Sequence, residues 1–121
     1  MFRKLTILAV LGGMTALNAS ARADEAATIR NDSLHAVPFV LRWTNLTYDS
    51  PLIVLAPGQS YTTRSGDGNA LFIRFNANPT NSQFPRWVNS RVFTRFAGPG
   101  DGGTLSVFRS PTAYDVELFL P

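Results

Sequence analysis

The apolar residues of this chain recur in short alternating segments, and this periodicity limits the possible folds more than any other feature. No run of ten or more residues carries the apolar stripe of an amphipathic helix. The segments are instead rich in β-branched and aromatic residues and are separated by Gly, Pro, Asn and Asp, which is typical of all-β proteins. The sequence therefore predicts a single antiparallel β-sandwich of about eight short strands.

Two segments alternate most regularly, residues 35–43 and residues 71–75. Because successive side chains of a strand point to opposite faces, every second residue of each segment is expected to lie in the core. These residues are Val37, Phe39, Leu41 and Trp43 in the first segment and Leu71, Ile73 and Phe75 in the second. Pro38 cannot donate a hydrogen bond to a ladder, which predicts an edge position for the first of these strands.

Shorter patterns predict the remaining strands, at residues 27–30, 52–55, 60–64, 91–96, 105–108 and 114–120. In the last of them Tyr114 falls in phase with Val116, Leu118 and Leu120, which predicts that its ring is buried. Asp67-Gly68 suits a type I′ turn and predicts a hairpin between the strands on either side of it. Other turns are expected at residues 31–33, 56–59 and 97–103, which are rich in Asn, Pro or Gly.

Residues 1–23 have the three parts of a secretory signal peptide. Arg3 and Lys4 precede an apolar stretch of 13 residues that ends at Leu17, and residues 21–23 read Ala-Arg-Ala, a small-x-small cleavage pattern. Thirteen residues of helix span about 20 Å, which is too short for a membrane core of about 30 Å. We therefore predict cleavage after Ala23, one domain at residues 24–121, a periplasmic or secreted location, and no membrane contact after cleavage.

Cleavage would remove the net positive charge of the chain. Three of the 11 basic residues (Arg3, Lys4 and Arg22) precede the cleavage point and all 8 acidic residues follow it, so 8 residues of each sign remain. This balance argues against nucleic acid binding driven by bulk charge. The lack of Cys excludes thiolate-ligated metals, and a single His excludes a multi-His metal site. We predict no metal and no cofactor.

Two short patterns between Asn31 and Thr63 carry a resemblance. They are Val37-Pro38-Phe39-Val40-Leu41-Arg42, which has a V-x-F-x-L-R pattern, and the turn Leu55-Ala56-Pro57-Gly58-Gln59-Ser60. In these patterns the chain resembles small exported bacterial β domains. The likeness covers about a quarter of the chain and consists of turn chemistry. It implies a sandwich fold and no particular activity.

Candidates for catalysis are few. Asp115 and Glu117 lie two residues apart in a predicted strand, hence on one face and about 7 Å apart, which is within the range of a glycosidase carboxylate pair. The alternative is that each carboxylate pairs with an arginine of a neighbouring strand. A Ser–His–Asp triad would need His35, and no Gly-x-Ser-x-Gly elbow is present.

Two acidic loops that contain glycine, at Asp67 and Asp101, offer oxygen ligands of the kind that calcium binds. Neither loop has the spaced series of acidic residues that would fill a coordination shell. Turn chemistry explains both loops without a metal, and the sequence leaves open whether either binds calcium.

Arginine is followed by an aromatic residue at four places, residues 42–43, 74–75, 86–87 and 95–96. If the aromatic side chains of the strands face the core, then Arg42, Arg74, Arg91 and Arg95 are expected to line one outer sheet face. Arginines interleaved with aromatic rings bind phosphate, sulfate or carboxylate groups and stack on sugars. Trp87, beside a loop with two prolines, is the best candidate for an exposed aromatic residue in this face.

These observations predict an exported, non-catalytic binding or structural module with a glycan, an anionic ligand or a protein as its partner. The predicted ligand-binding residues are Arg42, Arg74, Arg91, Arg95 and Trp87. Two alternatives remain open on the sequence alone. One is a small secreted hydrolase that uses Asp115 and Glu117, and the other is a self-assembling envelope component whose strand edges pair between chains.

Overall fold

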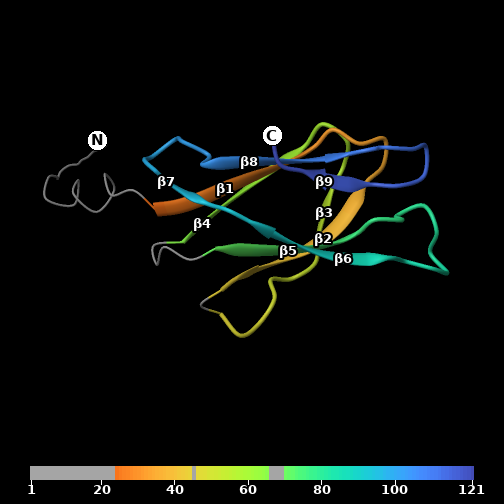
Figure 1. Cartoon of the computed structure of the whole chain (residues 1–121), viewed down its shortest axis with the longest axis horizontal. Coiled ribbons are helices and arrows are strands. Elements are labelled where there is room, and N and C mark those ends of the chain that lie inside the picture. Colours follow the sequence, from red (N-terminus) through yellow and green to blue (C-terminus); the bar gives the residue numbers. More distant parts are fainter. Residues whose placement is uncertain (1–23, 45, 66–69) are drawn as a thin grey trace, which may run out of the picture.

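The computed structural model describes residues 24–44, 46–65 and 70–121. The predicted signal peptide, residues 1–23, and the Asp67 loop lie outside the described residues. The described part of the chain contains nine strands in two sheets and no helix (Figure 1), which confirms the all-β class. It accordingly has no helix that is long and apolar enough to span a membrane.

The first sheet has the order β4-β1-β8-β9, with β7 also paired to β1. Its strands are β1 (Asp24–Asn31), β4 (Ser60–Ser65), β7 (Arg95–Ala97), β8 (Thr104–Arg109) and β9 (Glu117–Phe119). The second sheet has the order β3-β2-β5-β6. Its strands are β2 (Val37–Trp43), β3 (Ile53–Leu55), β5 (Leu71–Asn76) and β6 (Trp87–Val92).

One strand pair departs from the predicted antiparallel arrangement, because β1 and β8 run parallel. The first residues of β1 pair antiparallel with β7, and Asp24 lies opposite Ala97. Residues 98–103 then reverse the chain, so that β8 starts at Thr104 opposite Ala27 and follows the direction of β1. Alternation of apolar residues is the same in parallel and antiparallel strands, so it does not contain this information.

Buried apolar residues from both sheets form one cluster, which contains Phe108. The Phe108 ring centroid lies 5.5 Å from that of Phe39 and 5.2 Å from that of Phe75, so β8 of the first sheet contacts β2 and β5 of the second. The core predicted from the two alternating segments is confirmed: Val37, Phe39, Leu41, Trp43, Leu71, Ile73 and Phe75 are all buried. Hydrophobic burial therefore holds the two sheets together.

The turn after β1 is built around a buried asparagine, as its short polar side chains predict. The Asn31 amide donates to the carbonyl oxygens of His35 and Leu55, both at 2.8 Å. Its side-chain oxygen accepts from the backbone N–H of Ser33 at 2.9 Å and from the Ser33 hydroxyl at 2.6 Å. The polar atoms of Asn31 are thereby satisfied inside the protein, and they link the end of β1 to β3.

The prediction that Tyr114 is buried is wrong, because its side chain is 69% exposed. The last strand contains only Glu117–Phe119, and Tyr114 lies in a turn before it. The Thr112 hydroxyl oxygen accepts from the backbone N–H of Asp115 at 3.1 Å, which closes this turn. A local side-chain bond to the backbone competes here with the extended conformation that alternation predicts.

Two predicted connections are also wrong, because the chain crosses between the sheets where the pattern predicts continuity. β4 and β5 belong to different sheets, so the strands that flank the Asp67 loop do not form a hairpin. The predicted strand at residues 91–96 is likewise divided between β6 and β7, which lie in different sheets on either side of Phe93.

Pro38 has a paired strand on one side only, although β2 as a whole is not an edge strand. β2 lies between β3 and β5, so the predicted edge position of this strand is wrong. Pro38 lies opposite Val54 of β3, whereas the pairing with β5 begins at Phe39. The missing amide hydrogen is therefore tolerated at a position with a neighbour on one side only.

Candidate binding face

Three of the four predicted arginines lie on the outer face of the second sheet. Arg42 of β2 and Arg91 of β6 flank Phe72 of β5 in one row, since Arg42 is opposite Phe72 and Phe72 is opposite Arg91. Arg74 is two residues further along β5 than Phe72 and lies between Val40 of β2 and Asn89 of β6. We call this surface the arginine face. It is the side of the sheet opposite to the buried Leu41, Ile73 and Phe75.

Arg95 does not belong to the arginine face, so its predicted position is wrong. It lies on β7 in the first sheet. Alternation over residues 91–96 predicts one strand, but the chain crosses between the sheets after Val92, and this crossing separates Arg95 from Arg91. The other predicted residue, Trp87, begins β6 and is 45% exposed, as expected.

Asp49, a carboxylate for which no sequence pattern predicts a role, lies over the arginine face. One of its oxygens lies 2.8 Å from Nη2 of Arg74, and the other lies 3.8 Å from Nε of Arg42. The preceding loop folds back on β2 because Ser50 donates its backbone N–H to the Leu41 carbonyl at 2.7 Å. The Ser50 hydroxyl oxygen also accepts from the backbone N–H of Leu41 at 2.9 Å. No spacing in the sequence indicates this long-range position.

The arginine face carries more positive than negative charge. Arg42 and Arg74 share the single carboxylate of Asp49. The Arg91 guanidinium lies 5.7 Å from the ring centroid of Phe93 and forms no ion pair with a described residue. Three guanidinium groups thus face one carboxylate among the residues that the structure describes, which leaves an excess of two positive charges.

Two adjoining hollows lie on this face, and Arg74 and Val40 line both. The smaller, of about 120 Å³, has four polar or charged residues in its lining, which consists of Val40, Arg42, Asp49, Phe72, Arg74 and Asn89. The larger, of about 470 Å³, is more apolar and is lined by Val40, Leu52, Arg74 and Trp87. An apolar wall beside a few convergent polar groups is the usual composition of a ligand site.

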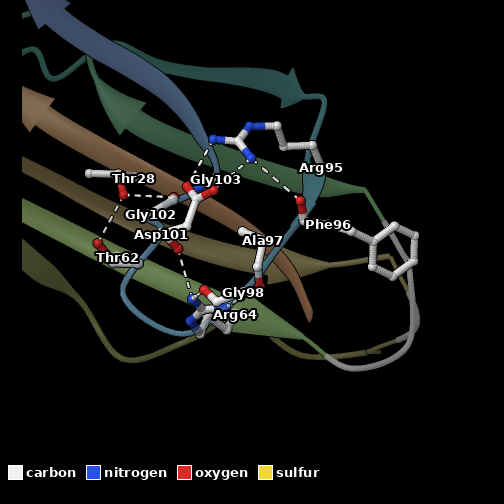
Figure 2. Close-up of polar contacts among 10 residues, drawn as sticks. All are labelled: Thr28, Thr62, Arg64, Arg95, Phe96, Ala97, Gly98, Asp101, Gly102 and Gly103. Carbon is white, nitrogen blue, oxygen red and sulfur yellow. Dashed lines mark hydrogen bonds and ion pairs between the residues drawn. The ribbon is translucent and has the colours of Figure 1, made fainter. Parts of the chain in front are cut away.

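Arg95 and Arg64 instead hold the loop between β7 and β8 (Figure 2). Arg95 donates to both carboxylate oxygens of Asp101, at 2.9 and 2.8 Å, and the Gly103 backbone N–H donates to one of them at 2.9 Å. Arg64 donates to the carbonyl oxygens of Gly98 at 2.6 Å and Asp101 at 2.7 Å. The loop oxygens that a calcium ion would need already accept hydrogen bonds, which does not favour a calcium site at Asp101.

The same contacts make the loop sensitive to acid. The hydrogen bonds from Arg95 and from the Gly103 backbone lower the pKa of Asp101 below its ordinary value. The ionised carboxylate therefore stabilises the folded protein above the unfolded-state pKa of about 4, and this contribution is lost as the pH falls through the lower folded-state pKa. We expect Asp101→Asn to be less stable than the wild type at pH 7. We expect the difference to shrink below about pH 4, as measured by urea unfolding at several pH values. A difference that stays constant with pH would contradict the assigned role of the carboxylate.

The predicted carboxylate pair is divided between separate partners. Asp115 lies 3.6 Å from Nη2 of Arg86, and Glu117 forms an ion pair with Arg109 across the β8–β9 pair. His35 Nε2 lies 2.6 Å from the carbonyl oxygen of Ala113. The described residues contain no group of three acidic, His or Cys side chains that could hold a metal. These contacts are those of ion pairs between neighbouring segments, and they do not favour the hydrolase alternative.

Comparisons with known proteins add no relative to this description. No family model, no curated protein and no solved structure matches the chain.

Proposed function

We propose that this protein is an exported, non-catalytic binding module that takes an anionic ligand on the arginine face. In this proposal the two sheets pack face to face as a β-sandwich, and the outer face of β3-β2-β5-β6 remains available to the ligand. The observation that carries the proposal is the unequal pairing of Arg42 and Arg74, which share one carboxylate, beside Arg91, which has none among the described residues.

The chemistry of these groups supports an anion rather than a cation or a neutral ligand. A guanidinium has five N–H donors and stays charged at any physiological pH, so one carboxylate oxygen satisfies only part of it. Arg74 bonds Asp49 through Nη2, and Arg42 approaches Asp49 through Nε. Both arginines line the hollow that also contains Asn89, and each guanidinium has N–H donors beyond the one nearest Asp49.

Export is the second part of the proposal. It rests on the signal peptide pattern of residues 1–23 and implies a periplasmic or extracellular ligand. The intact mass of the exported protein tests this, since a mass that still includes residues before Asp24 would contradict cleavage after Ala23.

Binding of dextran sulfate at low salt tests the ligand surface. We expect the double variant Arg42→Gln/Arg74→Gln to lose about tenfold or more in affinity, because a hydrogen bond to a charged group contributes about 1.5–3 kcal/mol. The matched control is Arg30→Gln, which removes an exposed arginine of the first sheet that is paired with Asp32. It is expected to change affinity less than twofold.

Asp49→Asn provides an independent test in the opposite direction. It removes the carboxylate that competes with the ligand for Arg42 and Arg74, so we expect dextran sulfate to bind more tightly. Isothermal titration calorimetry measures both effects. Equal affinities for the wild type, Asp49→Asn and the double variant would overturn the proposed surface.

A further inference from the structure

We infer that the anionic ligand is an acidic polysaccharide, a chain of uronate sugars, with one sugar ring packed beside Trp87 and its carboxylate at Arg42 and Arg74. This inference rests on the proposed function and specifies the ligand class of the same face. It is carried by the junction of the two hollows, because Arg74 lines both the smaller hollow with its polar groups and the larger, more apolar one.

The larger hollow provides what a sugar ring needs. The apolar face of a pyranose packs against aromatic and aliphatic groups, and here the walls are the indole of Trp87 with Leu52 and Val40. Leu52 is 60% exposed and therefore leaves apolar surface uncovered in the free protein. A hollow of about 470 Å³ is large enough for at least one sugar residue.

The smaller hollow provides partners for a carboxylate and for hydroxyl groups. A carboxylate accepts from a guanidinium in a planar, two-point geometry, for which Arg42 and Arg74 have donors beyond those that Asp49 uses. The Asn89 amide and the Asp49 carboxylate line the same hollow and match hydroxyl donors and acceptors. A ring at Trp87 with its acidic group near Arg74 therefore uses both hollows at once.

The spacing of charge favours a uronate chain over denser polyanions. Arg42 and Arg91 lie on strands separated by β5, which corresponds to about 10 Å at the usual strand spacing. Nucleic acid presents a charge about every 1.7 Å and is bound by extended basic surfaces, whereas this face has three arginines and a carboxylate. A uronate chain has one charge per sugar and interleaves each charge with apolar ring surface.

The experiment compares four probes by calorimetry on the chain from Asp24 onward. They are tetragalacturonate, its neutral methyl ester, tetraglutamate and dextran sulfate. We expect tetragalacturonate to bind at least tenfold more tightly than the methyl ester or tetraglutamate. Trp87→Ala is expected to weaken tetragalacturonate binding about tenfold or more and to change tetraglutamate binding, which involves no sugar ring, less than twofold, while Trp87→Phe restores most of the loss.

The matched control is Tyr114→Ala, which removes an exposed aromatic side chain that lines a different hollow with His35 and Asn78. It is expected to leave every affinity unchanged. Dextran sulfate binding that needs Arg42 and Arg74, with no preference for tetragalacturonate over its methyl ester or tetraglutamate, would overturn the uronate inference and leave the proposed function standing. Stronger binding of tetraglutamate would point to an acidic peptide instead. Binding of none of the charged probes would overturn both proposals.

Discussion

Phe108→Ala is expected to lower the free energy of unfolding by about 3–5 kcal/mol, the range for removing a buried aromatic ring from a core. Phe108 is completely buried on β8, and its ring contacts Phe39 and Phe75 of the second sheet. The substitution removes the ring contacts with both Phe39 and Phe75, and it leaves a cavity that neighbouring strands cannot readily fill. Because small domains are stable by only about 5–15 kcal/mol, a large fraction of the stability is lost.

Urea unfolding followed by tryptophan fluorescence measures this loss, since Trp43 is buried in the same core. Phe84→Ala is the matched control, because it makes the same chemical change at a side chain that is 70% exposed. We expect it to change the stability by less than about 0.5 kcal/mol. Equal effects of the two substitutions would contradict the position of Phe108 in the core.

Gly103→Ala is expected to lower the free energy of unfolding by about 2–5 kcal/mol, because two separate costs add. Gly103 has a φ of 73°, which L-residues with a side chain adopt at a cost. A Cβ atom at this position would also overlap the backbone carbonyl of Ala26 on β1, and backbone atoms in a sheet cannot move aside cheaply. The substitution therefore disturbs the start of β8 beside the residues that Arg64 and Arg95 hold (Figure 2).

Gly100→Ala separates these two costs. Gly100 lies in the same loop with a φ of 81°, but a Cβ atom there would meet nothing within 4 Å. We expect Gly100→Ala to lower the free energy of unfolding by about 1–2 kcal/mol, which is the cost of the left-handed backbone conformation alone. Urea unfolding of both variants gives the comparison. If Gly103→Ala were no more destabilising than Gly100→Ala, the close approach between this loop and β1 would not be the reason that position 103 requires glycine.

Only part of the candidate site can be predicted from the sequence. Alternation predicts that Arg42 and Arg74 point away from the core, and both do, because each strand buries its other face. The same reasoning assigns Arg95 to the wrong sheet, since periodicity does not show where a chain leaves one sheet for the other. It also misses Asp49, whose place beside the two arginines depends on a loop folded back onto Leu41.

The all-β class, most turns and the buried face of β2 and β5 can be predicted from the amino-acid sequence, because they depend on backbone preferences and on a local period of two. The pairing of the strands is known only from the folded chain. There β1 and β8 are parallel, β4 and β5 lie in different sheets, and Asp49 lies at the arginine face. These arrangements depend on contacts between residues far apart in the chain, and a local sequence pattern does not show which distant segment will pair with a given strand.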